Sequence, residues 1–244
     1  LVLNGSLGIF PDLGNATILV LVALIMYTVS GIAYRWFSTI LALLAGSSML
    51  VLSVIRFVGV EKFSQIPVFG YVAKRFSAFF NPFNDLAGAG HQLANSYYAM
   101  VNGGWFGLGL GNSIEKRGYL PEAHTDFVFS IVIEEFGFVG ASMILALLFF
   151  LILRIILVGI RAKDPFNSMV AIGVGGMILV QVFVNIGGIS GLIPSTGVTF
   201  PFLSQGGNSL LVLSVAIALV LNIDASEKRA KLIREYENQT DESL

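Results

Sequence analysis

The residues best suited to chemistry lie in one stretch, Tyr119–Phe129, which reads YLPEAHTDFVF. It places Glu122, His124, Thr125 and Asp126 within five positions, directly before a long apolar run. A carboxylate within hydrogen-bond reach of a hydroxyl group can take its proton as the hydroxyl attacks, which accelerates such a step by roughly 10²–10⁴-fold. The stretch therefore predicts a catalytic site.

Asp126 is the candidate general base in this stretch. An Asp at this position would also suit the N-cap of a helix that begins near Phe127, because its side chain can accept a hydrogen bond from an unpaired backbone N–H. The residues alone favour neither role over the other. The two roles are also compatible.

The composition is that of a membrane protein. Of 244 residues, 55% are hydrophobic and only 12% are charged, and the mean hydropathy is +0.83. Lipid is the expected solvent for most of such a chain. The absence of cysteine excludes disulfides and Cys-ligated metals, and two histidines leave little room for a His-rich metal site. A net charge of -1 argues against nucleic acid as the main partner.

Five apolar runs have about the length that a helix needs to cross the ~30 Å hydrocarbon core. They cover residues 16–34, 37–55, 138–157, 169–186 and 205–223. The predicted fold class is therefore all-α, a polytopic transmembrane helical bundle that forms a single membrane domain over residues 1–244.

Lys and Arg in the short connections predict the orientation, because cytoplasmic loops collect positive charge. Arg35 lies between the first two runs, and Arg161 and Lys163 lie between the third and fourth. The fifth run is followed by Lys228, Arg229, Lys231 and Arg234, in a tail of mixed charge over residues 224–244. These places share one side if the runs alternate, and that side is predicted to be the cytoplasm. Segment 56–137 is then a long structured extracytoplasmic loop. The tail is predicted to be a solvated helix or disordered.

Other segments on the predicted outer side are also unusual. Residues 87–101 are predicted to form a short helix with Gln92 and Ser96 on one face. The aromatic and glycine-rich stretch 103–111 suits re-entrant backbone at the membrane surface. Segment 187–209 holds two prolines and six glycines between two apolar runs, which predicts a structured loop on the same side as Asp126.

Four blocks of the sequence, in order, resemble the shape-elongation-division-sporulation (SEDS) family. They are Pro11–Gly14; the series Arg75, Phe79, Asn81, Pro82, Asp85, Gln92 and Ser96; the run from Gly107 through Tyr119–Phe127 to Gly140; and Pro194–Ser209. The segment Tyr119–His124 is more similar to the FtsW-like division members than to the elongation members. Phe10, Ile133, Gln205 and Asn208 depart from the family pattern without removing a charged residue.

The resemblance implies a ten-helix membrane protein, of which this chain is similar to the second half, so we expect a further part upstream. Members of the family are peptidoglycan glycosyltransferases that join lipid II units into glycan strands on the outer membrane face. They work with a class B penicillin-binding protein, a transpeptidase. The implied function is septal glycan synthesis at the bacterial cell membrane, with other division proteins as partners. The family's essential aspartate falls at Asp126.

The resemblance also implies which residues meet the substrate. A pyrophosphate leaving group gathers negative charge that cations can stabilise, and Arg75 and Lys116 stand at the matching outer-face positions. A divalent cation, Mg²⁺ or Mn²⁺, near Asp126 or Glu122 is an open alternative without a ligand spacing to support it. Further candidates for contacts with saccharide or peptide are Glu122, His124, Thr125, Gln92, Ser96, Thr196, Ser204 and Ser209. Their hydroxyl groups could equally form hydrogen bonds between helices.

Two other functions stay open at this point. Polar residues in broken helices would also suit a transporter that flips lipid II, although the reactive residues gather at one face, which favours chemistry over transport. The other alternative is a non-catalytic scaffold that activates the crosslinking transpeptidase.

Overall fold

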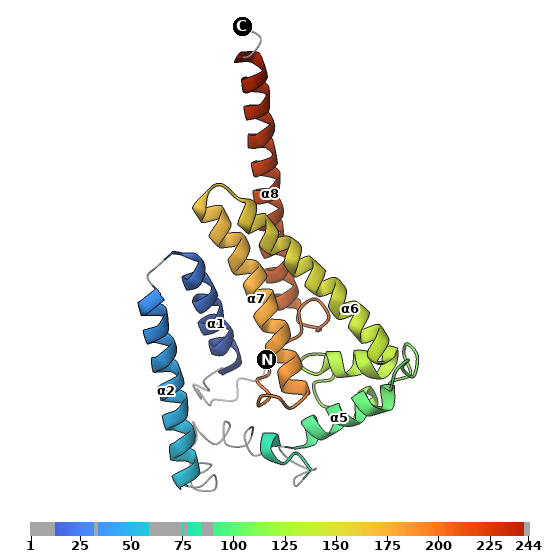
Figure 1. Ribbon diagram of the computed structural model, residues 1–244. Coiled ribbons are helices and arrows are strands. Elements are labelled where there is room, and N and C mark those ends of the chain that lie inside the picture. The colour runs from blue at the N-terminus through green and yellow to red at the C-terminus, as the bar shows by residue number, and fades with distance from the viewer. Residues whose placement is uncertain (1–12, 32–33, 59–74, 76–77, 84–89, 242–244) are drawn as a thin grey trace, which may run out of the picture.

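The computed structural model describes residues 13–31, 34–58, 75, 78–83 and 90–241 (Figure 1). Every regular element within these ranges is a helix. Three of the described helices, α6, α7 and α8, are long and apolar enough to cross a membrane. The predicted all-α, polytopic fold class is therefore confirmed. Phe10, Pro11, Asp12 and Asp85 of the resemblance lie outside the described residues.

The first two helices form an antiparallel pair at one side of the molecule (Figure 1). Helix α1 spans Leu13–Val29 and α2 spans Tyr34–Val58. They lie over the predicted runs 16–34 and 37–55. Gly31 follows α1 with a φ of 73°, a left-handed conformation that glycine adopts without steric cost.

Helix α7, Pro165–Ile189, is the central element, since it packs against α1, α5, α6 and α8. It begins where the Asp164 side chain accepts a hydrogen bond from the backbone N–H of Asn167 at 3.0 Å, with Pro165 in the first turn. Its Ile178 and Val182 are fully buried in the main core, together with Phe200 and Leu213.

Helix α6 is a bent helix of 34 residues, Val128–Arg161. Gly137 breaks it with φ 70° and ψ 179°, so residues 128–136 and 138–161 form two arms. The predicted run 138–157 lies within the second arm. The first arm precedes that run and carries Glu134 and Glu135, both of which are buried.

Two short helices lie beside the first arm of α6. Helix α5 spans His91–Gly103 and overlaps the predicted helix at 87–101, of which residues 87–89 lie outside the described residues. The 3₁₀ helix η1 spans Glu115–Arg117. Both belong to the end of the molecule opposite the C-terminal tail (Figure 1).

Helix α8 runs without a break from Gly207 to Asp241 and so joins the predicted span 205–223 to the predicted tail. Of the two alternatives for the tail, a helix is present as far as Asp241. Ion pairs four residues apart, Lys228–Asp224 at 2.5 Å and Lys231–Glu235 at 3.7 Å, line its polar part.

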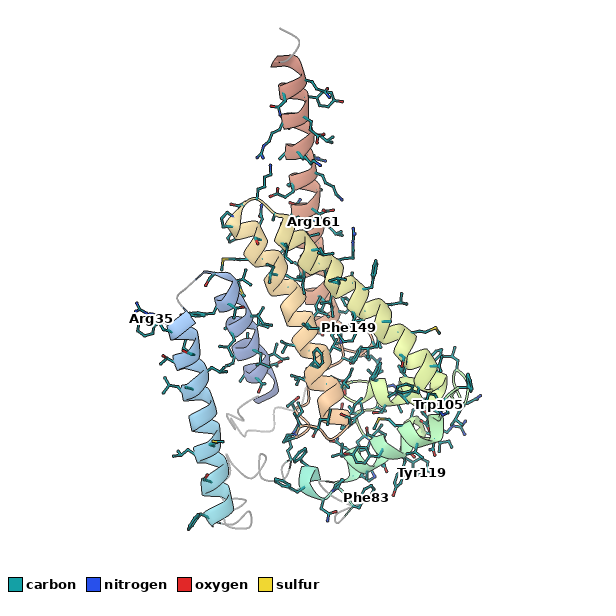
Figure 2. All side chains as sticks on the ribbon, in the orientation of Figure 1. Arg35, Phe83, Trp105, Tyr119, Phe149 and Arg161 are labelled. Carbon is teal, nitrogen blue, oxygen red and sulfur yellow. The ribbon has the colours of Figure 1, made fainter. Side chains whose placement is uncertain are left out.

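The two ends of the bundle differ in the residues that they display. Figure 2 shows Arg35 and Arg161 toward the end from which the α8 tail projects, whereas Phe83 and Tyr119 lie toward the opposite end. This is the arrangement expected if the basic connections share one side of a membrane. The side itself remains a prediction.

Candidate active site

The loop that follows α7 and the loop that precedes α6 form the walls of a small pocket that opens to solvent. Four residues that the sequence singled out line this pocket: Arg75, Gln92, Asp126 and Thr196. The end of α7 supplies a further part of its wall through Asn185, Gly188 and Ile189. Residues far apart in the chain are thus gathered around the predicted general base.

Asp126 and Arg75 meet at Gly197. A Cβ atom added to Gly197 would lie 3.3 Å from Asp126 Oδ2 and 3.1 Å from Arg75 Nη2. The guanidinium is also held by a hydrogen bond from its Nη1 to the backbone oxygen of Ser195. Gly197 has a φ of 76°, so both its conformation and its neighbours favour glycine. The carboxylate and the guanidinium therefore face the same point of the pocket wall.

The segment before Asp126 is a tight turn built on Glu122. Glu122 has a φ of 57°, rare for a residue with a side chain, and its backbone oxygen accepts from the N–H groups of Thr125 at 3.1 Å and Phe127 at 3.3 Å. Thr125 Oγ1 donates to Glu122 Oε2 at 2.7 Å. The N-cap position of α6 is Phe127, without a side-chain cap bond, so Asp126 does not occupy the cap position.

Ser204 and Gln205 tie this turn to the loop after α7. Ser204 Oγ donates to the backbone oxygen of Thr125 at 2.6 Å and accepts from the N–H of Phe200 at 2.7 Å. The backbone N–H of Gln205 donates to the oxygen of His124 at 2.8 Å. Ser204, a predicted substrate contact, is thus engaged in holding the two loops together.

Asn185, which the sequence analysis did not single out, makes the most direct connection to Asp126. Its Nδ2 donates to the backbone oxygen of Asp126 at 2.7 Å and to that of Val198 at 2.7 Å. The side chain is buried, and its Oδ1 is buried without a hydrogen-bond partner. The available signal was an amide side chain in the apolar run 169–186, which also holds Gln181. Such amides are also typical of polar contacts between helices.

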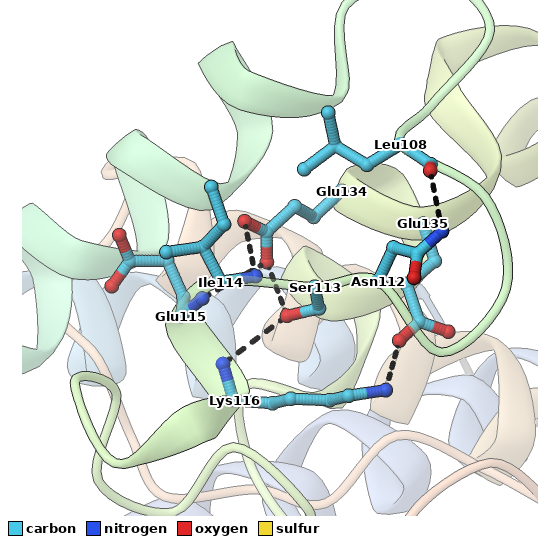
Figure 3. A network of polar contacts seen from close by, with 8 residues as sticks. All are labelled: Leu108, Asn112, Ser113, Ile114, Glu115, Lys116, Glu134 and Glu135. Carbon is cyan, nitrogen blue, oxygen red and sulfur yellow. Dashed lines mark hydrogen bonds and ion pairs between the residues drawn. The ribbon is translucent and has the colours of Figure 1, made fainter.

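A second polar cluster is built around Glu134 (Figure 3). Its carboxylate accepts a hydrogen bond from Ser113 Oγ, from the N–H of Ile114 at 3.1 Å and from the N–H of Glu115 at 3.4 Å. The Glu134 side chain is fully buried. A buried carboxylate needs such donors to offset the loss of water, so Glu134 fixes the segment around η1 against the first arm of α6.

Lys116 belongs to this second cluster and not to the pocket. Its Nζ forms an ion pair with Glu135 Oε1 (Figure 3), and Lys116 is not among the residues that line the Asp126 pocket. The two cations that the resemblance assigned to pyrophosphate are therefore placed differently. Arg75 lies beside Asp126, whereas Lys116 joins η1 to α6.

The glycine-rich stretch 103–111 closes the kink of α6. Its backbone pairs with both sides of Gly137: Leu108 N–H to Glu134 O at 2.9 Å, Gly109 N–H to Glu135 O at 2.9 Å, Phe138 N–H to Gly104 O at 2.9 Å and Val139 N–H to Trp105 O at 3.1 Å. A Cβ at Gly107 would lie 2.2 Å from the oxygen of Glu135. The loop thus satisfies backbone groups that the kink would otherwise leave unpaired.

The remaining candidates differ in accessibility. Ser96 is fully buried, and its Oγ lies 2.7 Å from Ser130 Oγ and donates to Ile189 O at 3.2 Å. Glu122 and His124 are exposed in the turn before Asp126. Ser209, at the start of α8, does not line the Asp126 pocket but lines an adjoining hollow that shares Gly197 and Val198 with it. Among the described residues, no group of three or more His, Asp or Glu side chains is arranged to hold a metal ion.

A carboxylate and a guanidinium in one pocket can accept a proton and hold an anion, which suits attack by a hydroxyl with a phosphate leaving group. Known proteins are similar to this chain over most of its length. The chain is 58% identical over 224 residues to the probable peptidoglycan glycosyltransferase FtsW of Lactococcus lactis subsp. lactis (strain IL1403), covering 92% of this chain and 53% of that protein. It is 42% identical over 215 residues to stage V sporulation protein E of Bacillus subtilis (strain 168), covering 87% of this chain and 54% of that protein.

A solved structure described as "Structural coordination of polymerization and crosslinking by a peptidoglycan synthase complex" is similar, with a TM-score of 0.63 and 28% identity. The similarity covers 89% of this chain and 56% of that chain. The chain thus spans about half the length of the curated relatives that it matches. Residues 1–229 match the cell cycle protein family of FtsW, RodA and SpoVE. The chain therefore belongs to the FtsW/RodA/SpoVE family, the SEDS family of membrane proteins.

Proposed function

We propose that the full-length protein is a peptidoglycan glycosyltransferase and that this chain carries its general base, Asp126. The names of its relatives support the reaction class. The single observation that carries the assignment of residues is the convergence of Asp126 and Arg75 on Gly197, at the wall of one pocket.

In the proposed reaction, a sugar hydroxyl of one lipid II attacks the anomeric carbon of another. Asp126 takes the hydroxyl proton as the new glycosidic C–O bond forms. The C–O bond to the pyrophosphate breaks, and undecaprenyl pyrophosphate leaves with the electron pair. The Arg75 guanidinium stabilises the negative charge that develops on this leaving group.

The other pocket residues have positioning roles in this proposal. Gln92 and Thr196 line the pocket and offer uncharged hydrogen-bonding groups to the saccharide. Glu122 and His124 stand at its exposed rim. Because both substrates are anchored in the membrane, the entropic cost of bringing them together beside the pocket is reduced.

The membrane face of the pocket and the partner protein are also part of the proposal. The end that holds the pocket lies opposite the α8 tail, with its Lys and Arg residues, and opposite Arg35 and Arg161. We therefore assign the pocket to the extracytoplasmic face of the bacterial cell membrane. The crosslinking named for the similar complex suggests a class B penicillin-binding protein as the partner. Identity to FtsW of L. lactis favours septal synthesis, whereas FtsW and stage V sporulation protein E of B. subtilis are about equally similar, at 41% and 42%.

The test uses the full-length protein, purified and reconstituted with lipid II and the partner transpeptidase. We expect glycan polymer from the wild type and from Asp224→Asn, a matched loss of a carboxylate on α8. We expect none from Asp126→Asn that still folds and binds the partner. Polymer from Asp126→Asn at the normal rate would remove Asp126 from the mechanism. Movement of lipid II across the bilayer without polymer would indicate a transporter, and stimulation of the transpeptidase alone would indicate a scaffold.

A further inference from the structure

Asn185 joins the two loops that form the catalytic pocket, and it does so at the catalytic residue itself. One of its two Nδ2 hydrogens is directed at the backbone oxygen of Asp126, and the other at the oxygen of Val198, each over 2.7 Å. Val198 directly follows Gly197, which contacts both Asp126 and Arg75. One amide group therefore sets the spacing between the base and the wall against which it lies.

The orientation of this amide is dictated by its surroundings. Both partners are carbonyl oxygens, which only accept, so the NH₂ side of Asn185 must face them. Its Oδ1 then points elsewhere and is buried without a partner. An unpaired buried acceptor costs free energy. The fold retains this cost at a residue with only 4% of its surface exposed, which argues that the two donated bonds matter more than the satisfaction of the oxygen.

We propose that Asn185 is a positioning residue that holds Asp126 at its working distance from Arg75. The proposal rests on the proposed function, since it assigns the residue a role in the same reaction. Although Asn185 forms part of the pocket wall, its Nδ2 group is engaged by the backbone oxygens of Asp126 and Val198. It acts through the Asp126 backbone, because a shift of that carbonyl moves the attached carboxylate relative to the guanidinium beside Gly197.

The main test replaces Asn185 with Leu, a side chain of similar size that donates nothing and adds no charge. In the full-length protein we expect kcat for lipid II polymerisation to fall by roughly 10- to 100-fold, as for a catalytic group misplaced by up to about 1 Å. KM should change little, because the base acts in the transition state. The acidic limb of the kcat–pH profile should move to higher pH, since a carboxylate farther from a guanidinium ionises less readily.

A matched control separates positioning from loss of stability. Asp164→Ala removes the N-cap of the same helix, α7, at its opposite end. It should lower thermal stability by a comparable amount while leaving kcat per folded molecule and the pH profile as in the wild type. If Asn185→Leu fails to fold, Asn185→Ser, which keeps one hydroxyl donor, serves in its place with a smaller fall in kcat.

The outcomes distinguish this inference from the proposed function. A wild type without polymerisation, or an active Asp126→Asn, would overturn the proposed function. An active wild type and an inactive Asp126→Asn, together with an Asn185→Leu whose kcat and pH profile equal those of Asp164→Ala, would overturn only the role of Asn185.

Discussion

Gly197→Ala is the substitution that most directly tests the pocket geometry, because its new side chain would contact both Asp126 and Arg75. The new Cβ would lie 3.1 Å from Arg75 Nη2 and 3.3 Å from Asp126 Oδ2. Contacts this close require the neighbours to give way by a few tenths of an ångström. Since a misplacement of about 1 Å can cost ~10²-fold in rate, we expect kcat to fall by roughly 4- to 10-fold from this displacement.

Backbone strain must be separated from this effect, because alanine at a left-handed position costs roughly 1–2 kcal/mol of stability by itself. Gly31→Ala is the matched control for this backbone strain. Gly31 has a φ of 73°, against 76° at Gly197, and a Cβ there would meet nothing within 4 Å. Both variants should therefore lose similar thermal stability.

The assay is the rate of lipid II polymerisation per folded molecule of full-length protein, alongside thermal unfolding. Only Gly197→Ala should lose rate. Equal rates for the two variants would refute the argument that Asp126 and Arg75 act together at this wall.

Three further predictions concern residues around the pocket. Ser96→Ala should lower the free energy of unfolding by about 1 kcal/mol through the lost hydrogen bonds, with KM for lipid II unchanged; a raised KM would restore Ser96 as a substrate contact. Lys116→Met and Glu135→Gln should each lower the melting temperature, and the double variant should lose less than their sum, because neither charge is then left unpaired; additive losses would argue against the ion pair. Burial and then the Glu134 carboxylate raise the pKa of Glu115, with a smaller opposing effect of His91. The native state therefore binds this proton more tightly than the unfolded state, and stability should fall as pH rises from the ordinary glutamate range through the raised pKa. Glu115→Gln should flatten that fall in thermal unfolding measured over a pH series, and an unchanged pH dependence would contradict the assignment.

The membrane helices could be predicted from the sequence, because the length of an apolar run is enough to indicate a spanning helix. The limits of α6 were not, since its first arm carries Glu134 and Glu135, whose charges interrupt the hydropathy of the run. Those charges are tolerated because Ser113, backbone amides and Lys116 reach them from η1 and the two residues before it. Such donors are supplied by tertiary contacts and leave no local pattern.

In the candidate site, too, some residues could be predicted from the sequence, whereas the roles of others depend on tertiary contacts. Asp126 could be identified because its loop concentrates polar residues, and Arg75 because of a family resemblance. The role of Asn185 depends on bonds to residues 59 and 13 positions away, which no periodicity encodes. The prediction that Lys116 contacts the substrate rests only on its position in the family pattern. In the structure its side chain is held by an ion pair with Glu135 of α6.

The most direct test of the central claim is a structure of the full-length protein with two lipid II molecules, or non-reacting analogues, bound. The distance to measure is that from an Asp126 carboxylate oxygen to the attacking hydroxyl oxygen. The account predicts about 2.6–3.2 Å, the reach of a general base, with the pyrophosphate beside Arg75. Saccharides bound elsewhere, with the Asp126 carboxylate turned toward acyl chains, would contradict it.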